Sequence, residues 1–278
     1  MESKVTVYIT TKNRVDLLKR ALISVQKQTY RDLEIIVVND ASVDETQSYL
    51  SEEALNDARI ILVNNQLSMG ACHSRNLAIN IATGQYITGL DDDDFYLPNR
   101  IESLLVSYKP EFSFVCDNAY ALKNDSSFKK ETMQSGLIDL PVILNGNIGN
   151  QVFTEVYKLR EIGGFDVNLT SGQDYDVWVR LIEAFGPAQK LPQYTYVYDI
   201  IHGGGRVSTS ERSLQGALMF YKKHYSKMSK VNKRHQLIRL LTYGAKIKLT
   251  EHISIFFSKN MFKYTRVMLR RLYYALAA

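Results

Sequence analysis

The chain has 278 residues, of which 45% are hydrophobic, 11% aromatic and 23% charged. This is ordinary globular composition, and it excludes a disordered tail, a coiled coil and a collagen-like fibre. The formal net charge of +5 is unevenly distributed. Residues 1–214 hold 20 Lys and Arg against 28 Asp and Glu, a net charge of −8, whereas residues 215–278 hold 14 against one, a net charge of +13. We therefore expect an acidic body followed by a strongly basic tail.

The cysteine content and the apolar runs indicate a cytoplasmic protein. Cys72 and Cys116 cannot form a disulfide framework and have no partner cysteines at metal-ligand spacing, so both are expected to be reduced thiols. Residues 1–9 lack the charged-then-apolar pattern of a secretory leader, and we expect no signal peptide. The best apolar run of the tail, residues 253–257, is far shorter than the roughly 18 residues that a membrane-spanning helix needs, so no span is expected.

Short β-branched runs alternate with helical periodicity from residue 5 to about residue 120, which predicts strands joined by crossover helices in a largely parallel sheet. The first strand is expected over residues 5–9 and is followed by a helix with apolar residues at helical spacing from Leu17 to Val25. Ser42 and Glu45 have the spacing of a capping box that opens a second helix. A third helix follows Gly70 and ends at Gly84. The other strands are expected at 33–38, 60–63, 86–90 and 112–116.

Four adjacent aspartates, Asp91, Asp92, Asp93 and Asp94, follow the predicted strand 86–90 directly. Their mutual repulsion has to be offset by positive charge, and carboxylate oxygens are the ligands that Mg²⁺ or Mn²⁺ shares with a diphosphate. The alternatives are a solvated acidic loop and a helix N-terminus that favours Asp. Open α/β sheets bind ligands outside the carboxyl ends of their strands, which favours the metal site.

A second acidic pair, Asp174 and Asp176, precedes a predicted helix whose buried stripe includes Val177, Leu181 and Ile182. Asp174 is placed at the N-terminus of this helix, either as an N-cap or as a general base that projects into a cleft. Both roles have the same appearance in the sequence.

Other polar residues lie where predicted strands end. Thr10 ends the first strand, and Asp40 ends the second, where it either accepts hydrogen bonds from a base or ribose or shapes the following turn. Arg75, on the helix after Gly70, is either a nucleotide contact or a surface cation. His202 precedes three glycines after a strand-like segment at 194–201, and it is either structural or the completing ligand of a metal site.

Taken together, five blocks of sequence resemble the inverting glycosyltransferases of family 2, which have the GT-A fold. The blocks run from residue 5 to 14, 34 to 46, 70 to 76, 84 to 94 and 163 to 181, and the resemblance extends to about residue 210. It implies an α/β fold with a Rossmann-like, mostly parallel sheet flanked by helices. The expected domains are a catalytic domain over 1–214, with a nucleotide-binding half (about 1–116) and an acceptor half (about 117–214), and a helical basic extension over 215–278.

The resemblance also implies roles for single residues. Thr10 and Asp40 match positions that hold the uracil of a UDP-sugar, Arg75 matches a basic position near the nucleotide, and Asp92 matches a ribose or nucleotide contact. Asp93 matches the ligand of a Mn²⁺ or Mg²⁺ ion, although four consecutive aspartates allow the register to slip by one. His202 falls where some relatives supply a late metal or phosphate contact. Asp174 matches the catalytic base, with Gln173 in place of the glutamate that the family often has before it.

The implied activity is transfer of a sugar from a UDP-sugar to a hydroxyl of an acceptor glycan, with inversion. The tail has the Lys, Arg and aromatic residues of an amphipathic helix, including Tyr264, Val267 and Met268, which favours an anionic membrane surface. A peripheral enzyme on the inner face of the cell membrane suggests a polyprenyl-diphosphate-linked acceptor in surface-polysaccharide assembly. The alternatives are a tail helix that packs on the body and a non-catalytic nucleotide-sugar- or nucleic-acid-binding protein. No RNA-recognition motif is present, so no nucleic-acid partner is expected.

Overall fold

The computed structural model describes residues 3–124, 126–132, 135–146, 148, 151–199 and 210–277. The chain divides into two compact units. The first, here called the sheet unit, comprises Met1–Asp139, Ile148–Val167 and Val177–Gly204, and the second, the helical unit, comprises Leu140–Asn147, Asn168–Asp176 and Gly205–Ala278. The domain boundary predicted at residue 214 stays a prediction.

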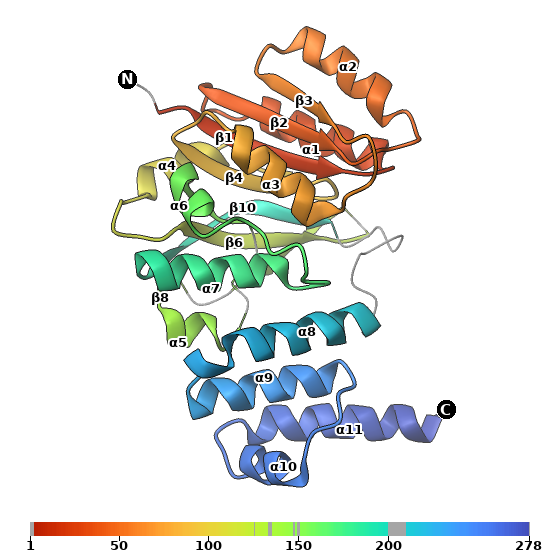
Figure 1. Ribbon diagram of the computed structural model, residues 1–278, viewed down its shortest axis with the longest axis vertical. Coiled ribbons are helices and arrows are strands. Elements are labelled where there is room, and N and C mark those ends of the chain that lie inside the picture. Colours follow the sequence, from red (N-terminus) through yellow and green to blue (C-terminus); the bar gives the residue numbers. More distant parts are fainter. Residues whose placement is uncertain are drawn as a thin grey trace. The chain divides into compact units, whose positions relative to one another are not determined.

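The sheet unit is built on a sheet whose described part has ten strands in the order β3-β2-β1-β4-β9-β6-β10-β5, with β7 on β6 and β8 on β10 (Figure 1). The strands β1 to β4 pair with one another in parallel, as predicted. Antiparallel pairs occur in the second half of the unit. The strands are β1 (Val5–Thr11), β2 (Leu33–Asn39), β3 (Ile60–Asn64), β4 (Tyr86–Asp91), β5 (Phe95–Tyr96), β6 (Val115–Leu122), β7 (Phe128–Glu131), β8 (Gly136–Ile138), β9 (Phe153–Glu155) and β10 (Ala188–Asp199).

Helices cover both faces of this sheet, and the period of two along β1 explains how (Figure 1). Val5, Val7 and Ile9 point to one face, where they join a buried cluster with Leu18 of α1 and residues of α4. The helix α3 contacts β1 and β2 and buries Ile79 outside that cluster. The helices with residues in this unit are α1 (Val15–Gln26), α2 (Thr46–Asn56), α3 (Ala71–Ile81), α4 (Arg100–Ser107), α6 (Val156–Glu161) and α7 (Gln173–Phe185).

Two local predictions are corrected by the structure. The capping box of Ser42 and Glu45 does not form: α2 begins at Thr46, and the Ser42 hydroxyl accepts a hydrogen bond from the backbone N–H of Asn13 at 2.9 Å instead. The strand predicted at 112–116 begins later, as β6, and continues to Leu122. Asp117 does not interrupt it because its carboxylate pairs with the buried guanidinium of Arg100 at 2.5 Å.

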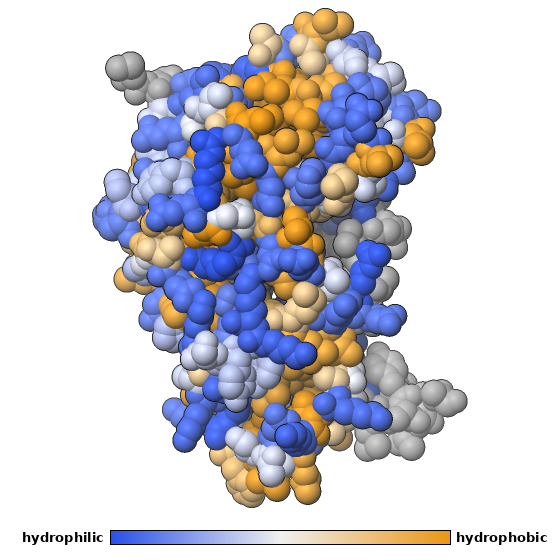
Figure 2. Space-filling view, viewed as in Figure 1, coloured by the Kyte–Doolittle hydropathy of each residue, from blue (hydrophilic) through white to orange (hydrophobic). Residues whose placement is uncertain are grey.

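The helical unit has its own core. Its described helices are α5 (Leu140–Ile143), α8 (Ser210–His224), α9 (Lys230–Thr242), α10 (Leu249–Phe256) and α11 (Met261–Ala277), with the short 3-10 helix η1 (Tyr225–Lys227) after α8 and the first turn of α7. Leu237, Ile238 and Leu241 of α9 form a buried cluster with Ile255 of α10, against which Val267 of α11 packs. Phe257 and Phe262 lie outside this cluster and are 81% and 82% exposed. Figure 2 shows apolar surface in the region where Figure 1 places α10.

Candidate active site

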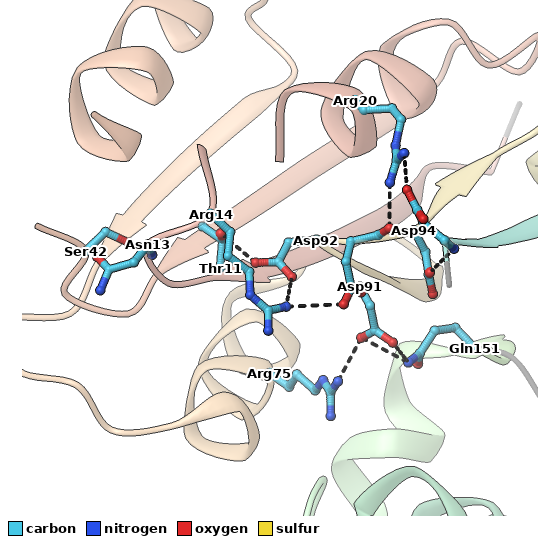
Figure 3. Close-up of polar contacts among 12 residues, drawn as sticks. Thr11, Asn13, Arg14, Arg20, Ser42, Arg75, Asp91, Asp92, Asp94 and Gln151 are labelled. Atoms are coloured by element: carbon cyan, nitrogen blue, oxygen red, sulfur yellow. Dashed lines mark hydrogen bonds and ion pairs between the residues drawn. The ribbon is translucent and has the colours of Figure 1, made fainter. Parts of the chain in front are cut away.

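The carboxyl ends of neighbouring parallel strands form the candidate active site of the sheet unit (Figure 3). The strand β1 lies between β2 and β4, and its Thr10 is in register with Val38 on one side and Asp91 on the other. Asp40 follows β2 directly, and its N–H donates to the carbonyl of Thr11 at 2.9 Å. The parallel register therefore brings three of the predicted segments to one edge of the sheet.

Asp40 is 5% exposed and holds the loop that leads into α3. Its carboxylate accepts hydrogen bonds from the backbone N–H of Met69 at 2.8 Å and of Gly70 at 2.9 Å, and from the side chains of Asn65 and Ser68 at 2.7 Å each. Burial alone raises the pKa of this carboxyl, but the four donors outweigh it and lower the pKa below its usual value. Gly70 has a φ of +86°, which L side chains rarely adopt, so the loop also depends on its glycine.

Asp91 joins α3 to the segment before β9. Its carboxylate accepts a hydrogen bond from Arg75 at 2.8 Å and lies 3.4 Å from the Gln151 side-chain nitrogen (Figure 3). The Arg75 guanidinium also lies 5.1 Å from the centre of the Phe165 ring, a cation–π distance. Arg75 is 8% exposed, so it is a fixed cation of the site and not an ordinary surface residue.

Arg14 bridges the next two aspartates. Its Nη1 lies 3.1 Å from Asp92 Oδ1 and 3.2 Å from Asp93 Oδ2 (Figure 3). Asp92 also accepts a hydrogen bond from the Thr11 hydroxyl at 2.8 Å. Burial raises the pKa of Asp92 to about 6, against the opposing effects of Thr11 and Arg14. The positive charge that the four aspartates require is thus supplied within this unit by Arg14 and Arg75.

Asp94 turns inward. It accepts hydrogen bonds from the Tyr196 hydroxyl at 2.7 Å and from the backbone N–H of Asp199 at 3.0 Å. Burial raises its pKa well above the usual value for an aspartate. Asp94 therefore has a structural role and offers no oxygen to a ligand at this edge.

The donor atoms at this edge fit a divalent cation that is shared with a substrate. Among the described residues, no group of three His, Cys, Asp or Glu side chains is placed to hold a metal ion by itself. Mg²⁺, however, is commonly bound through one or two carboxylates together with substrate phosphates. The Asp93 side chain is 29% exposed and already has a cationic group, the Arg14 guanidinium, at its oxygen. The residues therefore suit a shared ion and not a cage built by the protein alone.

Asp174 belongs to the helical unit and is described within it. It is the second residue of α7, in the first turn, so it does not cap the helix. The positive end of the helix dipole favours the ionised carboxylate there. Asp176 is fully buried and lies 2.8 Å from His224 Nε2 and 3.0 Å from Lys223 Nζ, both of α8. These contacts fix the first turn of α7 to α8 inside this unit.

The sequence did not identify every residue of the site. Arg14 contacts Asp92, 78 positions away, and Gln151 contacts Asp91, 60 positions away. The residues around Arg14 and Gln151 in the sequence give no indication of these contacts. His202 and its glycines lie outside the described residues. Cys72 and Cys116 are buried, and neither forms a disulfide among the described residues.

A family model completes this description. The model of glycosyl transferase family 2 matches residues 6–162, more than half of the chain. The chain belongs to glycosyl transferase family 2. The predicted family and enzyme class are confirmed, and the protein is a glycosyltransferase.

Two relatives carry names that bear on the reaction. The chain is 35% identical over 249 residues to the putative colanic acid biosynthesis glycosyl transferase WcaA of Escherichia coli K12, covering 85% of this chain and 86% of WcaA. It is 28% identical over 180 residues to WfgD of Escherichia coli, named as a UDP-Glc:α-D-GlcNAc-diphosphoundecaprenol β-1,3-glucosyltransferase, covering 64% and 70% of the two chains.

Solved structures confirm the predicted α/β GT-A fold. Residues 1–349 of Staphylococcus aureus TarS in complex with UDP-GlcNAc superpose with a TM-score of 0.65 at 16% identity, covering 95% of this chain and 79% of that one. The mannosyltransferase PcManGT of Pyrobaculum calidifontis, in complex with GDP-Man and Mn²⁺, gives a TM-score of 0.62 at 16% identity and covers 98% and 88%. In the part of the chain that is described, no helix is both long and apolar enough to cross a membrane.

Proposed function

We propose that this family 2 enzyme is inverting, and that it transfers a sugar from a UDP-sugar to a hydroxyl of a glycan linked to a polyprenyl diphosphate. The observation that carries the proposal is the edge of the sheet unit where Arg14, Arg75 and the aspartates meet. A nucleoside diphosphate needs cationic groups, and a shared metal needs acidic ones, and this edge offers both. The names of WfgD and of the TarS complex, which contain UDP-glucose and UDP-GlcNAc, support a UDP-sugar donor.

In this proposal the nucleotide lies across the ends of β1, β2 and β4. Thr10 and Asp40 are assigned to the uracil side, with Asp40 also holding the loop before α3. Arg75 is assigned to the nucleotide, at a position fixed by Asp91 and Phe165. Asp92, held by Thr11 and Arg14, is assigned to the ribose.

Asp93 is proposed to hold a Mg²⁺ or Mn²⁺ ion, for which the Mn²⁺ named in the PcManGT complex is a precedent on the same fold. When bound, such an ion offsets the negative charge that grows on the departing diphosphate. Arg14 is within 3.2 Å of the same carboxylate, so it is available to pair with a phosphate oxygen. His202 remains a weaker candidate for a further ligand.

Asp174 is proposed as the general base. It would take the proton of the acceptor hydroxyl as that oxygen attacks the anomeric carbon, and the bond from that carbon to the diphosphate breaks in the same step. One displacement inverts the anomeric configuration, so an α-linked donor gives a β-linked product. General-base assistance of this kind contributes about 10²–10⁴-fold to the rate.

The test combines donor binding with turnover. Asp174→Asn is expected to keep UDP affinity and to lose about 10²–10⁴-fold in transfer, whereas Asp93→Asn is expected to lose the gain in UDP affinity that Mn²⁺ confers, measured by calorimetry. Glu183→Gln, an exposed position further along α7, is the matched control and should behave like the unmodified enzyme. Undiminished transfer by Asp174→Asn would refute the assignment of Asp174 as the general base. If Mn²⁺ raises the UDP affinity of Asp93→Asn as much as that of the unmodified enzyme, Asp93 is not the metal ligand.

We also propose that the helical unit attaches the enzyme to the inner face of the cell membrane. Phe257 and Phe262 are exposed and lie next to Lys259 and Lys263 in the sequence, and Leu249 is 73% exposed at the start of α10. Apolar side chains next to cations suit an anionic lipid surface. A lipid-linked acceptor, like the one in the name of WfgD, is presented at such a surface.

Vesicle flotation tests this attachment. The double variant Phe257→Ser, Phe262→Ser should float less with phosphatidylglycerol vesicles than the unmodified protein does, and neither should float with neutral phosphatidylcholine. The control Val43→Ser, Leu55→Ser removes apolar residues that are 90% and 88% exposed in the sheet unit. Equal flotation of the two double variants would overturn the proposal.

A further inference from the structure

Four aromatic side chains of the sheet unit form a row outside its hydrophobic core. The ring of Phe128 lies 6.5 Å from that of Phe95 and 5.7 Å from that of Tyr120, and the ring of Tyr120 lies 5.1 Å from that of Tyr194. None of the four belongs to the buried cluster of this unit, and Phe128 is 49% exposed. We call this set the aromatic row.

Strand pairing explains why these residues meet. Phe95 of β5 is in register with Val197 of β10, and Val197 is in register with Tyr120 of β6. Residues directly opposite each other on paired strands share a face, so Phe95 and Tyr120 lie on the same face of the sheet. Phe128 of β7 is opposite Leu122, two positions along β6 from Tyr120, and therefore points to that face too. The row thus combines side chains of β5, β7, β6 and β10.

The aromatic row is continuous with the candidate active site at one end. Phe95 follows Asp94 directly in the chain. The guanidinium of Arg20 lies 5.0 Å from the centre of the Phe95 ring, and its Nη2 donates to the carbonyl of Asp93 at 2.7 Å. The same side chain pairs with Asp199 at the end of β10. One cation therefore connects the first ring of the row to the backbone of the proposed metal ligand.

The edges of the row are polar. Lys130 Nζ lies 5.0 Å from the centre of the Tyr194 ring, and the Tyr194 hydroxyl is hydrogen-bonded to Thr132. Binding sites for small ligands typically combine aromatic surface with a few polar groups that fix orientation. Partly exposed rings bordered by a hydroxyl, an ammonium and a guanidinium suit a ligand that has apolar C–H faces and a rim of hydroxyl groups. A pyranose ring has this character.

We infer that the aromatic row binds a sugar ring of the acceptor glycan and places it beside the reacting centre, an inference that rests on the glycosyl transfer proposed above. The nucleotide of the donor is assigned to the ends of β1, β2 and β4, whereas the row belongs to β5, β6, β7 and β10, so the nucleotide does not occupy the row. The row thus sets which acceptor the enzyme accepts, and not which donor.

The test uses the full chain with Phe128→Ala and, as a conservative variant, Phe128→Tyr. Tyr157→Ala is the matched control, since Tyr157 is 52% exposed in the same unit and its ring lies 5.9 Å from that of Phe185, outside the aromatic row. Thermal melting verifies that each variant is folded. The probes are the methyl glycosides of glucose, galactose and N-acetylglucosamine, observed by saturation-transfer NMR in the presence of UDP and Mn²⁺, with UDP affinity measured separately by calorimetry.

Saturation should pass from the unmodified protein and from Phe128→Tyr to the ring protons of at least one glycoside. Phe128→Ala should bind that glycoside about tenfold more weakly, with unchanged UDP affinity. Tyr157→Ala should match the unmodified protein. If no glycoside gives a signal that depends on Phe128 while UDP still binds, the inference about the row is overturned and the proposed function stands. If UDP itself does not bind the unmodified protein, the proposed function fails.

Discussion

Replacing Asp40 by Ala gives the most direct test of how the nucleotide edge is held together. The change removes the acceptor of four hydrogen bonds between 2.7 and 2.9 Å. The amide of Asn65 and the hydroxyl of Ser68 can turn to water, whereas the backbone N–H groups of Met69 and Gly70 lose the charged acceptor that holds them, a carboxylate of a residue that is 5% exposed. A net hydrogen bond to a charged group contributes about 1.5–3 kcal/mol, so losing the two backbone bonds costs about 3 kcal/mol or more.

The assay is urea unfolding at pH 7, with Asp16→Ala as the control. The Asp16 side chain is 90% exposed and lies 3.5 Å from Lys19, a pair that contributes less than about 1 kcal/mol. Asp40→Ala should also weaken UDP binding, because the loop that it releases leads into the helix that carries Arg75. If Asp40→Ala unfolds within about 0.5 kcal/mol of Asp16→Ala, the hydrogen bonds do not hold the loop and the reasoning is refuted.

The pKa of Asp40 adds a second readout with a definite sign. Its folded pKa lies below the ordinary value of 3.8, so the unfolded chain binds the proton more readily. The stabilisation is therefore fully present above about pH 4 and is lost as the pH falls through the folded pKa. The difference in unfolding free energy between the unmodified protein and Asp40→Asn should shrink below pH 4. A difference for Asp40→Asn that is constant across this window would contradict the assignment.

Three further predictions follow from buried groups. Arg75→Gln should weaken UDP binding about tenfold or more in calorimetry because it removes a fixed cation. The control Arg31→Gln, at an exposed position, should leave UDP affinity unchanged. Equal UDP affinities of the two variants would count against the nucleotide role of Arg75. Asp117→Ala should cost about 3–5 kcal/mol in urea unfolding because it leaves the fully buried Arg100 unpaired, and a loss below 1 kcal/mol would exclude a structural ion pair. Burial raises the pKa of the Cys116 thiol to about 12, so a thiol reagent should label it at pH 8 only after unfolding; rapid labelling of the folded protein would contradict its burial.

The parallel half of the sheet could be predicted because its signals are local. The four strands expected from β-branched runs form β1 to β4, each with its carboxyl end slightly extended. The strands β7, β8 and β9 have three or four residues each and no period of their own. They form by pairing with β6, β10 and β4, respectively. Pairing with a strand from another part of the chain leaves no pattern in the local sequence.

The polar contacts were predictable only in part, for the same reason. Ser42 has capping-box spacing, but the backbone of Asn13, brought near by the sheet, takes its hydroxyl instead. The sequence placed Arg14 in one of the blocks that resemble the family, but it did not predict the contacts of Arg14, because the two aspartate partners lie almost 80 positions away. Thr10, Asp40 and Asp91 were brought to one edge as expected, because parallel strands end on the same side.

The structure also bears on the register of the four aspartates, which the sequence left open by one position. The strand β4 ends at Asp91, and the backbone N–H of Asp94 donates to the carbonyl of Asp91 at 3.0 Å, so Asp92 and Asp93 lie in a turn. Asp91 and Asp93 are 35% and 29% exposed at the side chain, whereas Asp92 is 9% exposed and Asp94 is buried. An ion on Asp92 or Asp94 would have to displace Thr11 or Tyr196 from a buried carboxylate, and Asp91 is already shared between Arg75 and Gln151. A slip of the register by one would therefore cost buried hydrogen bonds, which favours Asp93 as the proposed ligand.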